Sequence, residues 1–403
     1  MFQHKKKRAK PSISARTIAN ERFPMPLRSK LPQVGVTIFT TMTQLANQHG
    51  ACNLSQGFPD FDVPSGLMEL VEKHMRAGHN QYAPMQGVAL LREKIAEKVF
   101  DLYGARVDPE LDITVTSGAT EALFAAITAV VHPGDAVIVF EPAYDSYVPV
   151  IELSGGRPIY HKMSFPGYRI DWNAVAEAAK EARLLVLNSP HNPTGTILTT
   201  EDIAALREIV RGSDLLIVSD EVYEHIIFDG RRHQSLLRDP ELAERSFVIS
   251  SFGKTYHATG WKIGYCIAPA ALTQEFRRIH QFLTFSSTTP IQMAYADFMQ
   301  QKNIYSDLPD FYQEKRDTFL SLLKDSRLRP LSCHGTYFQM LDYSAVSNES
   351  DTAFARRLTT EYGVAAIPPS LFYHDRDDHW VLRFCFAKKD ETLKKAAEIL
   401  CRI

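Results

Sequence analysis

Residues 250–265 read SSFGKTYHATGWKIGY and connect two apolar runs, 247–250 and 263–268, that predict β-strands. The lysine of this segment, Lys254, has small and aromatic neighbours on both sides. Burial among such neighbours lowers the pKa of an amine, and the neutral amine is then free to form a Schiff base. Lys262 and Ser251 add a cation and a hydroxyl that suit a phosphate group. The segment therefore predicts a reactive lysine beside an anion site.

The sequence on either side of this segment alternates between strand and helix patterns, from about residue 88 to 270. Helices are expected at 120–131 and 200–211, the second with Thr200 as its N-cap. Short continuous apolar strands alternating with helices predict an α/β fold with a mostly parallel sheet covered on both faces. The expected strands are 113–116, 136–140, 184–187, 215–218, 247–250 and 263–268.

Strict alternation ends after about residue 305, which predicts a smaller α+β domain. Its expected elements are a helix at 310–323, strands at 337–343 and 381–386, and a closing helix at 390–401. The predicted organisation is a basic, disordered leader (1–30), an N-terminal segment packing on the small domain (31–60), a large domain (61–304) and a small C-terminal domain (305–403). An organelle transit segment is the alternative for the leader, which contains Lys5, Lys6, Lys7, Arg8 and Lys10.

The composition excludes several classes of protein. The net charge of −2 gives no reason to expect nucleic acid or an anionic membrane as a partner, and no apolar run is long enough to span a bilayer. The five cysteines are scattered without a C-x-x-C pair, so no metal site is expected. Free thiols suit a reducing compartment, which predicts a cytoplasmic protein.

Three further polar segments follow predicted strands, where ligands bind in open α/β sheets. The first, SGAT at 117–120, offers backbone N–H groups at a helix N-terminus to a phosphate, or is a plain turn. The second, NSPHNPTG at 188–195, is a rigid turn whose Asn192 offers an amide, with turn chemistry alone as the alternative. The third contains Asp220, a costly buried acid unless a cation such as a protonated ring nitrogen pairs with it; a helix N-cap is the alternative.

From about residue 30 to the end, the chain resembles the class I/II, fold-type I pyridoxal-phosphate aminotransferases. The family's fold is a mostly parallel seven-stranded sheet covered by helices, with a smaller α+β domain. The segments LSQGFPDF at 54–61 and NQYAP at 80–84 are similar to the kynurenine/glutamine aminotransferase branch, in particular to bacterial methionine aminotransferases. The resemblance rests on six residues in order: Asn192, Asp220, Tyr223, Lys254, Lys262 and Arg383.

The resemblance implies that pyridoxal 5′-phosphate forms a Schiff base with Lys254, whose amine then shuttles the substrate proton. Asp220 would keep the pyridine nitrogen of the cofactor protonated. Tyr223 and Asn192 would hydrogen-bond the 3′ oxygen of the ring. Tyr144 would stack on the ring.

The cofactor phosphate would bind the backbone N–H groups of Ala119 and Thr120, with Ser251 and Lys262 beside it. Tyr82 would reach the same phosphate from a second subunit. The resemblance therefore implies a homodimer with shared active sites.

Arg383 is implied to bind the substrate α-carboxylate through a bidentate fork, assisted by Asn192 and the backbone of Gly57. The alternative for Arg383 is a surface ion pair.

The substrate side-chain pocket should be apolar, because no second arginine stands at a recognisable place for an acidic side chain. Its candidate walls are Phe39, Tyr82 and Phe338, with ordinary core packing as the alternative.

The predicted activity is transfer of the amino group of methionine and other large neutral or aromatic amino acids to a 2-oxo acid. A cysteine-conjugate or cystathionine β-lyase is the alternative, because both reactions begin with deprotonation at Cα. A more remote alternative is a pyridoxal-phosphate-binding regulator, although the 30-odd residues before the fold are too short for a winged helix.

Overall fold

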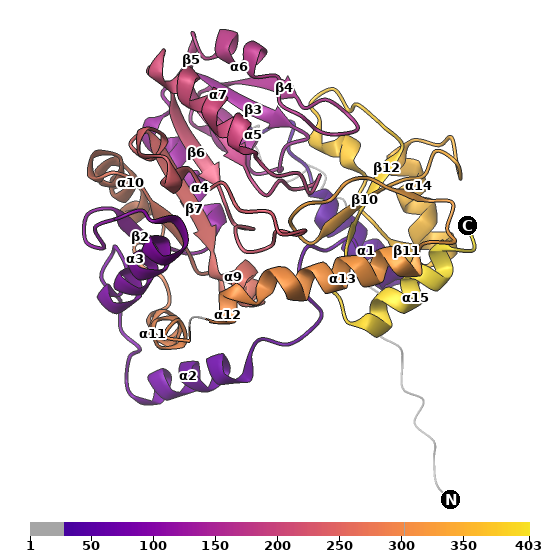
Figure 1. Cartoon of the computed structure of the whole chain (residues 1–403), viewed down its shortest axis with the longest axis horizontal. Helices are drawn as coiled ribbons and strands as arrows, with labels where there is room; N and C mark the ends of the chain where they lie inside the picture. Colours follow the sequence, from indigo (N-terminus) through magenta and orange to yellow (C-terminus); the bar gives the residue numbers. More distant parts are fainter. Residues whose placement is uncertain (1–27, 302) are drawn as a thin grey trace, which may run out of the picture.

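The computed structural model describes residues 28–301 and 303–403, so the basic run at 5–10 and most of the predicted leader lie outside the described residues. A seven-stranded sheet forms the centre of the larger part of the molecule (Figure 1). This confirms the predicted fold class. In spatial order the strands are β2 (Ile113–Thr116), β8 (Gly264–Ile267), β7 (Ser246–Ser251), β6 (Leu216–Asp220), β5 (Ala182–Asn188), β3 (Ala136–Glu141) and β4 (Arg157–Lys162).

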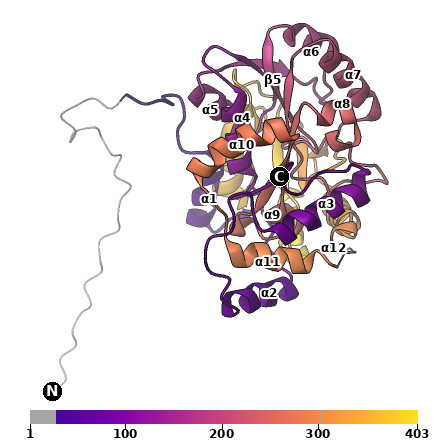
Figure 2. The same cartoon turned by 90° about the vertical axis from the view of Figure 1, so that its left-hand side faces the viewer.

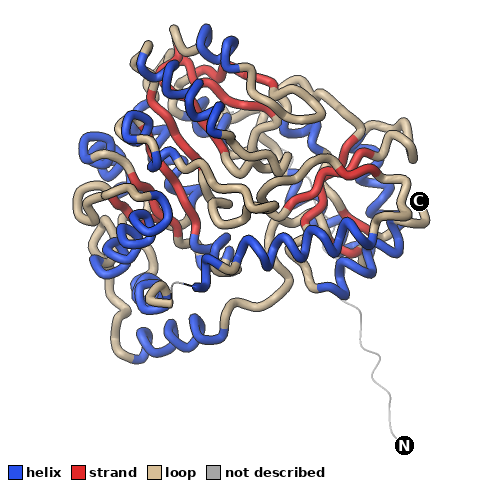
Figure 3. The backbone as a smooth tube through the Cα atoms, viewed as in Figure 1, coloured by secondary structure: helices blue, strands red, loops and turns tan. Residues whose placement is uncertain are grey.

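The direction of one strand differs from the rest. β8 pairs antiparallel with both β2 and β7, whereas the other neighbours pair in parallel. Gly264, the first residue of β8, is therefore opposite Thr116 and Ser251, the last residues of β2 and β7. Helices surround the sheet (Figure 3).

Both faces of the central strands are buried. Alternate residues of each strand point to opposite sides of the sheet, and each side packs on its own apolar cluster. Leu185 and Ile217 belong to the apolar cluster on one face, and Val186 and Val218 to the cluster on the other. This is why the central strands read as continuous apolar runs. The helices of this part are α2 (Ser65–Arg76), α3 (Ala89–Tyr103), α4 (Ala119–Val130), α5 (Tyr147–Leu153), α6 (Trp172–Ala178), α7 (Thr200–Arg211), α8 (Pro240–Ala243), α9 (Phe252–Thr255), α10 (Ala270–Leu283) and α11 (Thr289–Phe298).

Two details differ from the sequence-based expectations. β4 was not predicted, because it is an edge strand with exposed ends at Arg157 and Lys162 and lacks an apolar run. The N-cap of α7 is Thr199 rather than Thr200. Thr199 and Asp202 form a reciprocal capping box, which satisfies two backbone N–H groups at once.

The C-terminal elements build a second apolar cluster, to which residues before β2 contribute. β1 (Cys52–Asn53) pairs with β11 (Val364–Ala365), and α1 (Ile38–His49) buries Met42 in the same cluster as Leu393 of the closing helix. The other elements are α12 (Asn303–Ser306), α13 (Leu308–Leu322), β9 (Arg329–Pro330), β10 (Phe338–Asp342), α14 (Asp351–Arg357), β12 (Val381–Cys385) and α15 (Asp390–Leu400). Figure 2 shows α2 beside α11 at the bottom of the view, and Figure 1 shows both on the side of the molecule away from α14 and α15. Among the described helices, none combines the length and apolar character needed to cross a bilayer.

Candidate active site

A cavity of about 340 Å³ lies at the carboxyl ends of β5, β6 and β7. The structure brings all the predicted site residues to its wall except Tyr82. The residues it gathers are Phe39, Gly57, Ala119, Thr120, Tyr144, Asn192, Asp220, Tyr223, Ser251, Lys254, Lys262, Phe338 and Arg383.

Lys254 lies on the short helix α9, directly after β7, and not in an open loop as its sequence context suggested. Its Nζ donates hydrogen bonds to the hydroxyl of Tyr337 at 2.8 Å and to the carbonyl of Gly57 at 3.2 Å. Burial lowers the pKa of the Lys254 amine to about 8. A sizeable fraction of the amine is therefore neutral near physiological pH, as Schiff base formation requires.

Asp220 is the last residue of the central strand β6, and its carboxylate is buried at the carboxyl end of that strand. The Tyr147 hydroxyl donates to it at 2.7 Å and the backbone N–H of Val222 at 3.3 Å. Burial raises the pKa of Asp220 to about 6, so ionisation above that pH costs the folded protein stability. Within residues 28–301 and 303–403, no basic side chain forms an ion pair with Asp220. A cation placed in the cavity would offset the cost of the charge.

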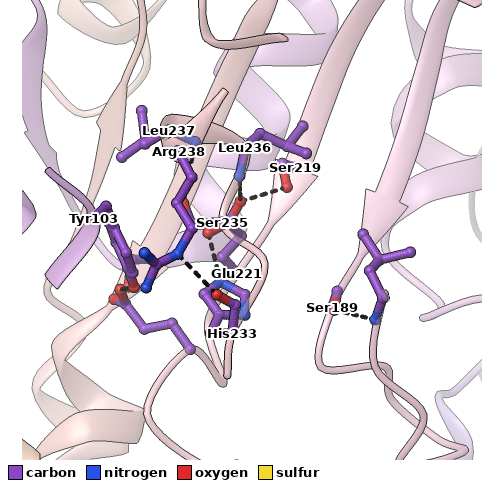
Figure 4. Close-up of polar contacts among 12 residues, drawn as sticks. Tyr103, Ser189, Ser219, Glu221, His233, Ser235, Leu236, Leu237 and Arg238 are labelled. Carbon is purple, nitrogen blue, oxygen red and sulfur yellow. Dashed lines mark hydrogen bonds and ion pairs between the residues drawn. The ribbon is translucent and has the colours of Figure 1, made fainter. Parts of the chain in front are cut away.

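The two acids that follow Asp220 in sequence are already compensated. Figure 4 shows the buried Glu221, which accepts hydrogen bonds from Ser219 Oγ at 2.8 Å and Leu236 N at 3.1 Å and lies 2.7 Å from His233 Nε2. The carboxylate of Glu224 pairs with the buried Lys98 at 2.6 Å. Of these three neighbouring acids, Asp220 is the one left to a ligand in the cavity.

Arg383 is on β12 with no exposed surface, so the surface ion-pair alternative is wrong. Its Nη1 donates to Asn192 Oδ1 at 2.8 Å and its Nη2 to the carbonyl of Ser55 at 2.9 Å. The guanidinium carbon lies 3.9 Å from the centre of the Phe338 ring. Among the described residues, Arg383 forms no ion pair and its buried Nε has no partner. Because a buried charge without a counterion is costly, a carboxylate in the cavity would supply the missing charge.

The opposite end of the cavity suits a phosphate. Helix α4 begins at Ala119, after Gly118, whose positive φ of 78° favours glycine. Lys262 Nζ lies 3.5 Å from Thr120 Oγ1. A Cβ atom on Gly118 would lie only 3.1 Å from this Nζ, so glycine leaves room for the cation beside the helix N-terminus. The positive helix end and the ammonium together favour an anion.

The structure adds three residues to the predicted set. Asn188 Oδ1 accepts from the backbone N–H of Asn192 at 2.8 Å, and its Nδ2 donates to the Asp220 carbonyl at 2.9 Å. The Tyr147 hydroxyl contacts Asp220, and the Tyr337 hydroxyl contacts Lys254. Asn188 lies within the turn recognised in the sequence, whereas no local pattern marks either tyrosine.

Tyr82 does not line the cavity of its own chain. Its side chain is 85% exposed, and its ring lies 5.6 Å from that of Phe285. The remaining predicted residues therefore form the site within one chain, and the prediction for Tyr82 concerns a second subunit.

Comparison with known proteins identifies the class to which this fold and site belong. Residues 50–400 match the profile of the family described as Aminotransferase class I and II. Methionine aminotransferase of Escherichia coli K12 is 54% identical, over 94% of this chain and 98% of that protein. The crystal structure of YbdL from Escherichia coli, whose reactivity identified a methionine aminotransferase function, matches with a TM-score of 0.92 and 53% identity, covering 94% of this chain and 100% of that one. Kynurenine–oxoglutarate transaminase of Dictyostelium discoideum is 35% identical, over 92% and 94% of the two chains.

The chain belongs to the class I and II aminotransferase family. It is a pyridoxal-phosphate-dependent aminotransferase, as the resemblance of its motifs predicted. The residues present fit this cofactor, because the cavity combines an amine with lowered pKa, an uncompensated carboxylate and a lysine beside a helix N-terminus.

Proposed function

We propose that this aminotransferase takes methionine and other large neutral or aromatic amino acids as donors, with a 2-oxo acid as acceptor. The observation that carries the proposal is the charge of the cavity wall, where the basic side chains of the described chain are Lys254, Lys262 and Arg383. Each of these has a role with the cofactor or the α-carboxylate, so the described residues of one chain leave no lining cation for an acidic side chain. Phe39 and Phe338 supply apolar wall instead, and thioether groups pack favourably on aromatic rings. The identity to methionine aminotransferase supports the same donor class.

The roles we propose for the residues follow from their positions. When bound, the cofactor supplies the electron withdrawal that makes the substrate Cα proton acidic. Lys254 would hold the cofactor covalently and, once released, would move the proton from Cα. Asp220 would keep the pyridine nitrogen protonated, while Tyr223 and Asn192 would hydrogen-bond the 3′ oxygen. Arg383 orients the α-carboxylate so that Cα faces the lysine.

We assign the remaining residues to the holding of the cofactor. Tyr144 covers one face of its ring. The backbone N–H groups of Ala119 and Thr120, with Ser251 and Lys262, bind its phosphate, which matches the positive charge at that end of the cavity.

We also propose a cytoplasmic homodimer in which Tyr82 completes the site of the partner. The exposed aromatic pair of Tyr82 and Phe285 supports this, together with Phe282, whose side chain is 87% exposed. Large apolar side chains left exposed in this way are typical of interaction surfaces. Sedimentation velocity of the purified protein tests the dimer, and a monomer at micromolar concentration would contradict it. The dispersed free cysteines fit a reducing compartment. Cell fractionation tests this location, and enrichment of the protein in another compartment would contradict it.

A single-turnover donor panel tests the activity. Methionine, leucine, phenylalanine and glutamine should each change the visible absorption of the bound cofactor, and a 2-oxo acid should restore it. Aspartate should react at least about tenfold more slowly, because its side-chain carboxylate meets no cation. An unchanged spectrum with all four neutral donors, or aspartate as the fastest donor, would refute the proposal. Release of pyruvate and ammonia from a cysteine conjugate without acceptor would instead reveal β-lyase activity.

Replacement of Arg383 by lysine should lower kcat/KM for methionine by about 100-fold, roughly 3 kcal/mol of transition-state binding. Lysine keeps the charge but loses the planar fork and the stacking on Phe338. The absorption of the bound cofactor should persist, because Arg383 is assigned to the substrate. Arg357→Lys is the matched control, since Arg357 pairs with Glu349 away from the cavity. Equal kinetics of the two variants would remove Arg383 from carboxylate binding.

A further inference from the structure

We propose that Tyr337 is a positioning residue for Lys254, and that its hydroxyl holds the lysine amine whenever the amine is not bonded to the cofactor. The inference rests on the proposed role of Lys254. The Tyr337 hydroxyl donates to the carbonyl of Gly57 at 2.5 Å and accepts from Lys254 Nζ at 2.8 Å. When its hydrogen points to Gly57, the hydroxyl offers a lone pair to the lysine.

The position of this hydroxyl is fixed by packing. Tyr337 has no exposed surface, and its ring lies edge-on to that of Tyr223 with centroids 5.1 Å apart. The rings of Phe338 and Tyr312 lie 4.9 Å and 5.7 Å away on other sides. Burial raises the pKa of Tyr337 well above its usual value of 10, so the phenol stays neutral and keeps its hydrogen toward Gly57. The lysine therefore meets an acceptor with one orientation.

Two fixed acceptors determine where the free amine directs its lone pair. Lys254 Nζ donates to both Tyr337 and the Gly57 carbonyl, which uses the two N–H bonds of the neutral amine. The remaining lone pair then points away from both acceptors and is available to a group in the cavity that Lys254 lines. A base that takes the Cα proton needs its lone pair in that direction. Tyr337 thus aims the amine without touching the substrate.

The first test is Tyr337→Phe, measured by the rate at which the full-length, cofactor-free protein takes up pyridoxal 5′-phosphate as a function of pH. In the wild-type protein the uptake rate should rise with pH through the pKa of Lys254, about 8, because only the neutral amine reacts. A hydrogen-bond acceptor stabilises the ammonium form of Lys254. Loss of the Tyr337 hydroxyl should therefore lower the apparent pKa of Lys254 by about one pH unit. At pH 7 the neutral fraction of the amine then rises about fivefold.

Turnover of Tyr337→Phe should fall, although its rate of cofactor uptake at pH 7 rises. The kcat of Tyr337→Phe with methionine should fall about tenfold, because the amine is no longer aimed, while KM stays within about twofold. A purely structural role would not lower the lysine pKa and kcat together with an unchanged KM. Tyr312→Phe is the matched control, because Tyr312 is equally buried in the same cluster but its hydroxyl lies 2.9 Å from His257 Nδ1.

An unchanged apparent pKa of cofactor uptake in Tyr337→Phe would overturn the proposal. So would a lower apparent pKa together with a lower kcat in Tyr312→Phe. If the wild-type protein takes up the cofactor without a covalent bond to Lys254, the proposed role of the lysine fails, and the Tyr337 proposal fails with it. Covalent uptake by the wild type with no effect of Tyr337→Phe overturns the Tyr337 proposal alone.

Discussion

Replacement of Lys254 by alanine is expected to lower turnover with methionine by about 10⁴-fold or more. The variant loses both the covalent attachment of the cofactor and the base at Cα, and each contributes on the order of a hundredfold or more. The visible absorption of the covalently held cofactor should disappear. The fold should survive, because alanine keeps α9 helical and relieves the cost of a buried amine. Absorption spectra, steady-state kinetics and thermal melting of the purified variant measure these three results.

Lys73→Ala is the control for this experiment. Lys73 is an exposed lysine paired with Asp297 at 3.1 Å, far in sequence and role from the cavity, and its loss should leave turnover unchanged. Turnover by Lys254→Ala within tenfold of the wild type would show that another group performs the proton transfer.

Asp220→Asn is expected to lower kcat by about 1000-fold, roughly 4 kcal/mol, with the cofactor still attached to Lys254. The carboxylate is buried and lacks a cationic partner among the described residues, so its charge is available to a protonated ring nitrogen. An amide has the same shape but no charge, and it cannot hold the proton there. Rapid-mixing kinetics of donor deprotonation, compared with KM, separate this effect from weaker binding.

Glu221→Gln distinguishes the charge at Asp220 from acidity in general. Glu221 is also buried, but its charge serves His233 and two further donors inside the protein. Its replacement should reduce the melting temperature, because it breaks a buried polar network. The folded fraction should keep turnover within about tenfold of the wild type. A larger kinetic loss in Glu221→Gln than in Asp220→Asn would reverse the assignment.

The sequence contained enough information to predict the sheet and most of the site. Strands buried on both faces read as apolar runs, and Asn192, Asp220 and Lys254 each follow one of them, so the carboxyl edge of the sheet brings them together. The edge strand β4 was not predicted because its two end residues are exposed and its other four are only partly buried.

Two contacts in the site could not be predicted from local pattern. The Tyr337 hydroxyl reaches Lys254 from 83 residues away in sequence. Tyr147 reaches Asp220 across 73 residues. Such contacts depend on how the C-terminal elements and α5 pack on the sheet, which no periodicity encodes.

The reversed direction of β8 has a consequence for how the protein keeps its cofactor. Lys254 and Lys262 lie on the single connection between β7 and β8, and Gly264 lies opposite the ends of β2 and β7. A parallel β8 would carry Lys262 to the other edge, about 13 Å away for a strand of this length. The separation between the Lys254 amine and Lys262, the cation assigned to the phosphate, is thus set by a short covalent connection. Arg383, by contrast, reaches the cavity from β12, in the C-terminal part of the chain. The two lysines assigned to the cofactor therefore come from one short connection of the sheet, whereas the arginine assigned to the substrate comes from the C-terminal part of the chain.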